Sequence, residues 1–394
     1  MARLGDIATV ITKGTTPTSI GFAFENDGIN FVKIESVDEN GNFICEKFDH
    51  ISDECHEKLK RSQLQENDIL FSIAGAIGRT AIVTKDILPA NTNQALAIIR
   101  IPQGAINYSF LLYILQSSVV LEQAEKKKQG VAQLNLSLKD IGDFIIPDIP
   151  LEEQQCIVDS LDKVSNLISL RKRQLSKLDE LVKSRFIEMF GYPISNSFGL
   201  NTKPMTDICE IIDGDRGKNY PTTDDFSDDG YCLFLNAKNV TSDGFNFDNC
   251  MYITEEKDAA LRKGRLKRGD VVLTTRGTIG NLAFYTNEIP FEHVRINSGM
   301  VILRMKQEVA DEVYFIEHFK MQLEDIKAKI ASGSSQPQLP ISTMNKIQIL
   351  IPEIEQQREF AAFVEQGDKS KFEIQKSLEK LETLKKALMQ KYFG

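Results

Sequence analysis

The chain has 394 residues, of which 42% are apolar and 26% are charged, a composition typical of globular proteins. This length predicts two domains of ordinary size rather than one hydrophobic core. The formal net charge of −9 argues against a nonspecific coat on nucleic acid, because phosphate binding depends on Lys and Arg, but it leaves room for a local basic face.

Targeting and redox signals are weak. The sequence has no run of about 18 uninterrupted apolar residues, which a membrane span needs, and the N-terminus lacks the apolar region of a signal peptide. We therefore expect a soluble, cytoplasmic protein with no membrane partner. The six cysteines are scattered without a Cys-x-x-Cys pair. They predict buried, reduced thiols, and we expect no metal site.

An internal repeat predicts the domain organisation. Residues 67–78 form an apolar strand pattern that leads into a glycine-punctuated turn, and the same pattern recurs at residues 269–280. Residues 93–100 likewise match residues 297–304. We therefore predict a duplicated α+β domain, with one copy in residues 1–150 and the other in residues 193–352.

Each copy is followed by a long helical pattern. The copies end in Ile-Pro, a Glu-Gln-Gln sequence follows, and the helices are predicted over residues 151–192 and 353–394. Apolar residues recur at intervals of seven from Leu161 to Met189, accompanied by Leu181, and from Ile374 to Leu388, accompanied by Leu384. This spacing is typical of a coiled coil, and antiparallel pairing is the simplest arrangement because a domain lies between the helices. Gly367 predicts a kink or a late start in the second helix.

Several loops combine cations for phosphate with amides and hydroxyls for base edges, which is the combination expected where a protein reads a DNA groove. The candidates in the first copy are Lys13, Thr15, Thr16, Lys33, Ser36, Asn91, Asn93 and Gln94. Those in the second copy are Arg216, Lys218, Asn219, Tyr220, Asn236, Lys238, Asn239, Arg276, Arg295 and Asn297. A solvated or structural turn is the alternative for each. The glycine turns at residues 75–78 and 277–280 are either backbone platforms for phosphate or tight turns between strands.

The sequence contains no catalytic motif that we can identify. The Asn/Asp-Pro-Pro-aromatic loop and glycine-rich cofactor turn of an adenine methyltransferase do not occur, so we expect no cofactor. Residues 214–219 are too short for a phosphate loop, and Asn219 stands where Ser or Thr would bind magnesium. Three hypotheses remain: a non-catalytic DNA-binding protein, a coiled-coil scaffold that binds no DNA, and a degenerate enzyme that has lost its site.

An ordered set of motifs occurs twice in the chain: a Leu-Gly-Asp-Ile-like opening at residues 4–7 and 205–208, a Gly/Thr/Pro-rich loop, Gly-x-Ile-Gly, and Ile-Pro followed by Glu-Gln-Gln. This set gives the chain, along nearly its whole length, a resemblance to the specificity subunits of type I restriction–modification systems. The resemblance implies two target-recognition domains, each of which reads one half of a bipartite double-stranded DNA target, with the long helices as spacers. It also implies methyltransferase (modification) subunits docked on the helices, ATP-dependent restriction subunits as further partners, and no enzymatic activity in this chain itself.

Overall fold

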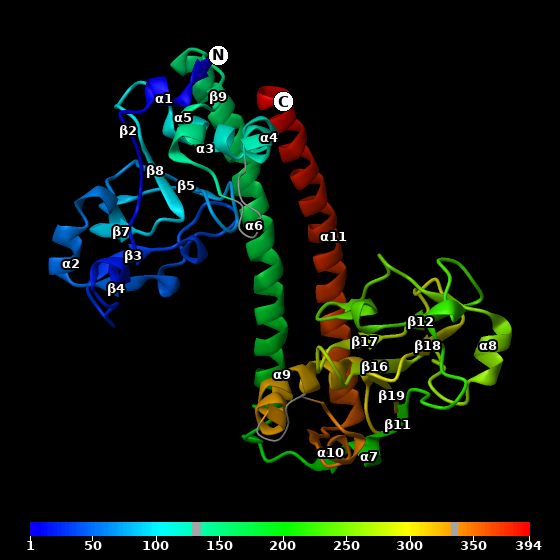
Figure 1. Ribbon diagram of the computed structural model, residues 1–394. Helices are drawn as coiled ribbons and strands as arrows, with labels where there is room; N and C mark the ends of the chain where they lie inside the picture. Colours follow the sequence, from blue (N-terminus) through cyan, green and yellow to red (C-terminus); the bar gives the residue numbers. More distant parts are fainter. Residues whose placement is uncertain (128–134, 332–337) are drawn as a thin grey trace. The chain divides into compact units, whose positions relative to one another are not determined.

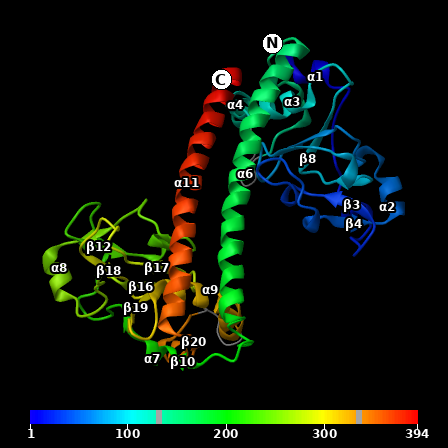
Figure 2. The same ribbon diagram turned by 180° about the vertical axis from the view of Figure 1, so that it is seen from behind.

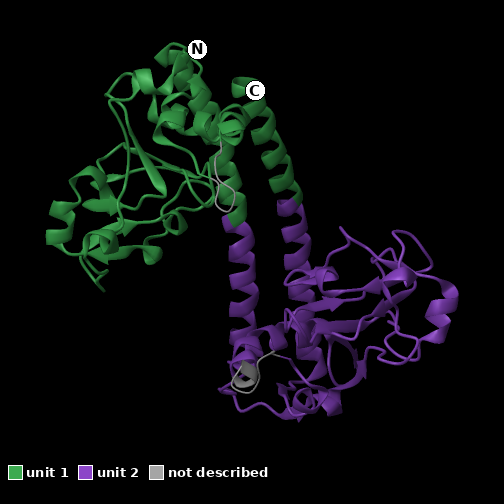
Figure 3. Ribbon diagram, viewed as in Figure 1, with its two compact units in different colours: residues 1–172, 376–394 green, residues 173–375 purple. Residues whose placement is uncertain are grey.

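The computed structural model describes residues 1–127, 135–331 and 338–394 (Figure 1). The chain forms two compact units, one from residues 1–172 with 376–394 and the other from residues 173–375 (Figure 3). Each unit contains one copy of the repeat and a part of both long helices.

The first unit is built on a four-stranded antiparallel sheet of order β2-β8-β5-β6. The strands are β2 (Val10–Lys13), β5 (Ile69–Ser72), β6 (Thr80–Ile82) and β8 (Leu96–Arg100). Successive side chains of a strand point to opposite faces. Ile69 and Phe71 accordingly pack into one hydrophobic core, and Leu70 packs into another. The sheet therefore has a core on each face, which explains why β5 is buried along its whole length.

A smaller sheet of order β4-β3-β7 completes the outer part of this domain, with β3 and β7 parallel. Its strands are β3 (Ile29–Val32), β4 (Asp49–Ile51) and β7 (Ala90–Thr92). Helix α2 (Asp53–Lys58) follows β4 and begins after Ser52, whose hydroxyl accepts a hydrogen bond from the Cys55 N–H at 3.3 Å. The short strands β1 (Ala2–Arg3) and β9 (Ile145–Ile146) pair and bring the two ends of the domain together.

Helices cover the face of the four-stranded sheet on which Ile69 and Phe71 lie. They are α1 (Leu4–Ile7), α3 (Tyr108–Leu115), α4 (Ser118–Lys127) and α5 (Leu138–Gly142), and they lie against the start of α6 (Leu151–Phe190) and the end of α11 (Ile354–Phe393) (Figures 1 and 2). Leu161 of α6 and Phe393 of α11 belong to the same core as Phe110 of α3. The ring centroids of Phe110 and Phe393 lie 5.5 Å apart. The long helices are thus part of the first domain's core.

The second unit repeats this plan, with a sheet of order β11-β19-β16-β17 and a smaller sheet of order β15-β12-β18. Its strands are β10 (Thr202–Pro204), β11 (Cys209–Asp213), β12 (Cys232–Leu235), β13 (Val240–Thr241), β14 (Gly244–Phe245), β15 (Tyr252–Ile253), β16 (Asp270–Thr274), β17 (Leu282–Phe284), β18 (Val294–Ile296), β19 (Met300–Met305) and β20 (Gln348–Leu350). Its helices are α7 (Met205–Ile208), α8 (Glu255–Ala260), α9 (Glu312–Ala331) and α10 (Ile341–Met344). The strand pairings correspond one to one, apart from the extra hairpin β13–β14, so the predicted α+β duplication is confirmed.

The long helices pair antiparallel, as predicted. In the second unit Lys371 of α11 contacts Asp179 of α6 at 2.7 Å, and Glu359 contacts Arg185 at 3.2 Å, so the numbers fall on one helix as they rise on the other. Helix α11 runs unbroken from Ile354 to Phe393, so the late start expected at Gly367 is wrong. Leu181 and Leu384 are 52% and 45% exposed, so these two residues do not belong to the buried seam.

All six cysteines are free, but only Cys55, Cys209 and Cys232 are buried, so the prediction of buried thiols is wrong for the exposed Cys45 and Cys156. Within the described residues, no helix combines the length and the apolar character that a bilayer crossing requires.

Candidate nucleic-acid interface

A glycine brings two predicted loops together in each domain. Gly14 follows β2, and a Cβ added there would lie 1.9 Å from the Thr92 carbonyl oxygen. A Cβ added at Gly214 would lie 2.2 Å from the Asn297 carbonyl oxygen. Any larger residue would therefore push the loop after β2 or β11 away from the loop after β7 or β18. The two loops lie about 80 residues apart in the sequence, and spacing alone does not show that they meet.

In the first domain this contact joins four of the predicted residues. The Thr15 N–H donates to the Thr92 carbonyl at 3.2 Å. The Thr16 hydroxyl hydrogen-bonds to the Gln94 side chain, and Asn93 Oδ1 accepts from the Ala95 N–H at 3.1 Å. Lys13 is the last residue of β2 and adds a cation next to this group.

The second domain joins its loops through different side chains. The Arg216 guanidinium donates to the Ser298 carbonyl at 3.2 Å, and the Ser298 N–H donates to the Tyr220 hydroxyl at 3.3 Å. Asn297 Oδ1 accepts from the Gly299 N–H at 2.9 Å. Asn219 points elsewhere, since its amide donates to the Ala260 carbonyl at 3.0 Å.

Two predicted arginines of the second domain share one hollow. Arg216 and Arg276 line a pocket of about 270 Å³ together with Asp213 and Gln338. Arg276 is exposed and lies in the turn after β16, where its N–H donates to the Gly299 carbonyl at 3.2 Å. Two guanidinium groups therefore lie at the edge of the joined loops.

The glycine turns have the geometry of tight turns. Gly75 and Gly277 both have φ +71°, a conformation that favours glycine, and each turn connects two antiparallel strands. A Cβ at Gly280 would lie 2.1 Å from the Leu323 side chain of α9, so this glycine also allows a helix to approach closely. These contacts account for the glycines without a ligand.

Lys33 and Asn236 lie beside the joined loops of their domains because of parallel strand pairing. Val32 of β3 lies opposite Thr92 of β7, and Leu235 of β12 lies opposite Ile296 of β18. The next residues therefore emerge side by side at the carboxyl ends of the strands. Lys33 already forms an ion pair with Asp49, and its ammonium group lies 4.5 Å from the Phe24 ring centroid.

Ser36 and Asn239 are fully buried in the turns that follow these strands. The Ser36 hydroxyl donates to the Lys47 carbonyl at 3.0 Å, and the Asn239 amide donates to the Asn246 and Asn249 carbonyls, each at 3.0 Å. Both side chains thus shape their turns from within. Lys238, in the same turn as Asn239, is exposed.

Asn91 and Arg295 are also buried, at 0% and 5% exposure, and both bind the turn that follows the domain's small helix. The Asn91 amide donates to the Leu59 carbonyl at 3.2 Å and to the Ser62 hydroxyl at 3.1 Å. Arg295 donates to the Lys263 carbonyl at 2.8 Å and forms an ion pair with Asp258. They hold the chain at equivalent places in the two domains.

These turns carry basic residues that the sequence analysis missed. Lys60 and Arg61 follow α2, Arg262 and Lys263 follow α8, and all four side chains are exposed. An Arg61 Nη2 hydrogen bond of 3.4 Å reaches the Thr15 hydroxyl, so this basic pair lies beside the glycine loop. The same offset of 202 residues that relates the glycine turns also relates the two pairs, so extending the repeat comparison finds them.

Asp215 fixes the second basic pair beside its loop. Its carboxylate accepts backbone N–H bonds of 2.6 Å from both Gly217 and Arg262. Burial opposes the charged form, but these backbone donors and the Arg262 guanidinium hold the pKa of Asp215 below its usual value. The ionised carboxylate therefore keeps Arg262 and Lys263 next to the loop of residues 214–218.

Comparisons with known proteins agree with this architecture. The family model described as type I restriction modification DNA specificity domain matches residues 1–180 and 199–386. The EcoBI specificity subunit of Escherichia coli is 32% identical over 170 residues, a match that covers 42% of this chain but only 35% of that protein. The putative MjaX specificity subunit of Methanocaldococcus jannaschii is 22% identical over 410 residues, covering 98% of this chain and 91% of that protein.

Solved structures show the same fold. A chain from a study of complex assembly and conformational transition of the type I R-M system has a TM-score of 0.57 at 18% identity, covering 100% of this chain and 96% of that one. The type I restriction-modification S subunit from M. genitalium has a TM-score of 0.53 at 16% identity, with 100% and 95% covered.

Proposed function

Because the chain belongs to the family of type I restriction–modification DNA specificity domains, we propose that it reads a bipartite double-stranded DNA target, with one half-site bound by each repeat. In this proposal residues 1–150 and 193–352 are the recognition domains. Residues 151–192 and 353–394 are the helical spacers. The DNA contacts come from the predicted loop residues that are exposed or partly exposed, with Lys60, Arg61, Arg262 and Lys263 added to them.

One arrangement carries the proposal: in both domains, an exposed basic pair lies beside a loop whose amides and hydroxyls are joined around a glycine. Lysine and arginine bind phosphate, whereas amide groups suit base edges such as those of adenine. In the first domain Arg61 reaches Thr15, next to the bonded pair Thr16 and Gln94. Phosphate binders and base readers therefore stand side by side, as a groove-facing surface requires.

The chain is proposed to act through partners rather than by chemistry of its own. Its net charge of −9 limits how strongly it can hold DNA alone, because unpaired acidic groups repel phosphate. Methyltransferase (modification) subunits would increase the affinity for DNA and methylate the target. ATP-dependent restriction subunits would cleave unmethylated DNA. We infer a cytoplasmic location for the complex, because the chromosomal and incoming DNA on which it would act lies there.

Binding of a labelled duplex, taken from the methylated motif of the host, tests the proposal. We expect weak binding by the purified chain and much tighter binding after its modification subunit is added. Lys60→Ala combined with Arg61→Ala should weaken binding by the complex about tenfold and make the salt dependence shallower by about one to two units of slope.

The matched control combines Lys126→Ala with Lys139→Ala, which removes the same charge from helices α4 and α5 on the other side of the sheet. The control should bind like the wild type. Equal losses in both variants would mean that general charge, not this surface, matters. If the assembled complex binds no DNA at all, the rival hypothesis of a coiled-coil scaffold holds.

A further inference from the structure

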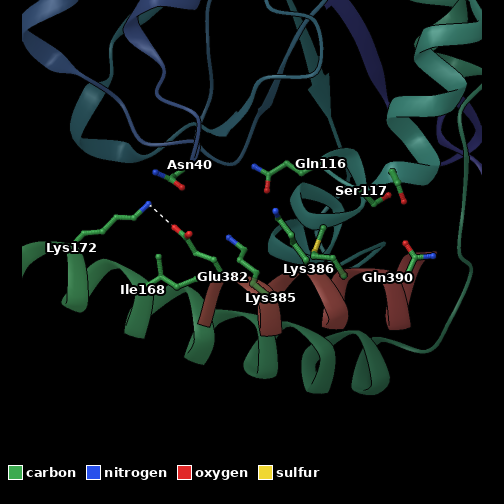
Figure 4. Close-up of a pocket in the computed structure, with 11 residues that line it drawn as sticks. Asn40, Gln116, Ser117, Ile168, Lys172, Glu382, Lys385, Lys386 and Gln390 are labelled. Carbon is green, nitrogen blue, oxygen red and sulfur yellow. Dashed lines mark ion pairs between the residues drawn. The ribbon is translucent and has the colours of Figure 1, made fainter. Parts of the chain in front are cut away.

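A second concave surface lies in the first unit, where the domain meets the helices (Figure 4). It encloses about 510 Å³, a size typical of small-ligand pockets. Lys385 and Lys386 of α11 line it together with Asn40 and Gln116 of the domain, and Ile168 and Met389 add apolar surface. None of these residues is among the candidates for DNA contact.

The pocket has more positive charge than its own acids neutralise. Lys172 is paired with Glu382 at 3.2 Å. Asp162, in an adjoining hollow, accepts the Tyr113 hydroxyl at 2.6 Å. Among the residues that the structure describes, neither Lys385 nor Lys386 has a carboxylate within ion-pair distance. Burial, and then repulsion from Lys172, lower the pKa of Lys385; attraction to Asp162 opposes this shift without cancelling it, and the Lys385 ammonium group lies 5.9 Å from the Tyr113 ring centroid.

The equivalent place in the second unit is a useful contrast. Gln154 and Gln357 play the same part in the two helices, since each accepts the backbone N–H of the residue just before α3 or α9. This offset of 203 residues puts Val182 at the position of Lys385, and Val182 is buried at 4% exposure. Gln375 stands at the position of Lys172. Lys183 stands at the position of Lys386, but the other two lysines of the pocket are replaced, so the charge excess of the first unit is not required by the shared fold.

We propose that this pocket binds an oxyanion, either phosphate or carboxylate, through the ammonium groups of Lys385 and Lys386. Each ammonium group carries three hydrogen-bond donors and one charge. The amide side chains of Asn40 and Gln116 lie across the pocket from the lysines and supply further polar groups (Figure 4). The apolar surface of Ile168 and Met389 favours an oxyanion that is attached to an apolar portion, such as an organic phosphate or an acidic side chain of a partner.

Calorimetric titration of the purified full chain with inorganic phosphate, at constant ionic strength set by chloride, tests the proposal. We expect saturable binding of phosphate with a dissociation constant of about 1 mM. The affinity should fall about tenfold in the variant Lys385→Ala/Lys386→Ala. The charge-conserving Lys385→Arg/Lys386→Arg variant should retain it. Lys183→Ala, at the position equivalent to Lys386 in the second unit, is the matched control and should bind phosphate like the wild type.

A parallel titration with glutarate separates the two sources of the anion. Binding of phosphate without glutarate assigns the pocket to a phosphate compound. Binding of both probes, lost when the modification subunit is added, assigns it to an acidic side chain of that partner. Either result supports the oxyanion site. The proposal is overturned if neither probe shows saturable binding, or if the double alanine variant, folded by circular dichroism, binds both probes as tightly as the wild type. These outcomes leave the DNA-binding function untouched.

Discussion

Arg304 holds Asp270 across the central strands of the second domain by two hydrogen bonds of 2.8 Å, one from Nε and one from Nη2. Asp270 is 1% exposed, whereas the Arg304 side chain is 28% exposed. The first domain repeats the pair, with Arg100 donating two bonds of 2.7 Å to Asp68. Two-point pairs of this kind fix the relative position of the strands as well as neutralising a buried charge.

We predict that Asp270→Ala destabilises the second unit by about 2–4 kcal/mol. The change removes the acceptor of two Arg304 hydrogen bonds and leaves the Lys267 N–H without its acceptor. Urea unfolding measures the loss. The matched Asp68→Ala change should cost a similar amount in the first unit. In a double-mutant cycle, the variant that carries both Arg304→Met and Asp270→Ala should be destabilised by less than the sum of the two single variants. Strict additivity would contradict a coupled pair.

His318 gives the second unit a pH dependence. Its Nε2 accepts the Leu350 N–H at 3.0 Å, its buried Nδ1 has no partner among the described groups, and burial lowers the pKa of His318 to about 3. The unfolded chain takes up a proton below a pKa of about 6.5, but the folded chain does not until about pH 3. This stabilisation is therefore complete above pH 6.5 and is lost as the pH falls towards 3.

We predict that His318 alone accounts for about 2 kcal/mol of lost stability between about pH 6.5 and pH 5. His318→Gln, which keeps an acceptor for Leu350, should lose that much less stability over the same interval in urea unfolding. His293→Gln removes a partly exposed histidine of the same unit and should behave like the wild type. Equal pH dependence of the wild type and His318→Gln would show that His318 does not titrate on unfolding.

The duplication and the long helices could be predicted because each depends on local pattern. The glycine turns recur at a fixed offset, and the apolar residues of α6 repeat at helical intervals. The exposure of Leu181 could not be predicted in this way, because the buried stripe of a helix depends on which neighbours pack against it, and those are distant in sequence.

The roles of individual polar residues were less predictable. Asn91 and Asn93 are the same residue type two positions apart, yet one is fully buried and the other is partly exposed. Arg295 is buried because Asp258, 37 residues earlier, neutralises it within the fold. Residue type indicates what a side chain can bind, but only tertiary contacts decide whether its partner is internal.

The two domains should be exchangeable readers. The second unit has its own hydrophobic cores, and strands β10 and β20 close its ends against each other. We predict that replacing residues 196–351 with the equivalent domain of another family member changes one half of the methylated sequence and leaves the other half intact. Methylome sequencing of strains with each chain provides the measurement. A change in both halves would refute two independent readers.

Arg216 and Lys218 lie in one loop but should contribute differently to DNA binding. Lys218 is exposed, and no ion pair of its side chain occurs among the described residues, so it can neutralise a phosphate without losing another contact. Arg216 is already paired with Asp213 at 3.1 Å and donates to the Ser298 carbonyl. A phosphate contact by Arg216 would replace the carboxylate of Asp213 with another anion. We therefore expect Arg216 to add to the binding affinity through a contact with a base edge.

We therefore predict two distinct losses in the complex with the modification subunit. Lys218→Ala should weaken binding to all sequences alike and make the slope of log affinity against log salt shallower by about 0.9. Arg216→Ala should cost about 1–3 kcal/mol of binding free energy on the cognate duplex and much less on a duplex altered at one base pair of the second half-site. It should leave the salt slope nearly unchanged.

Lys267→Ala removes an exposed lysine before β16, away from the joined loops, and serves as the control. If Arg216→Ala instead weakens all duplexes equally, Arg216 binds the backbone and another residue of the loop reads the base. If neither variant differs from Lys267→Ala, the loop of residues 214–218 does not face DNA, although the basic pair after α8 still could.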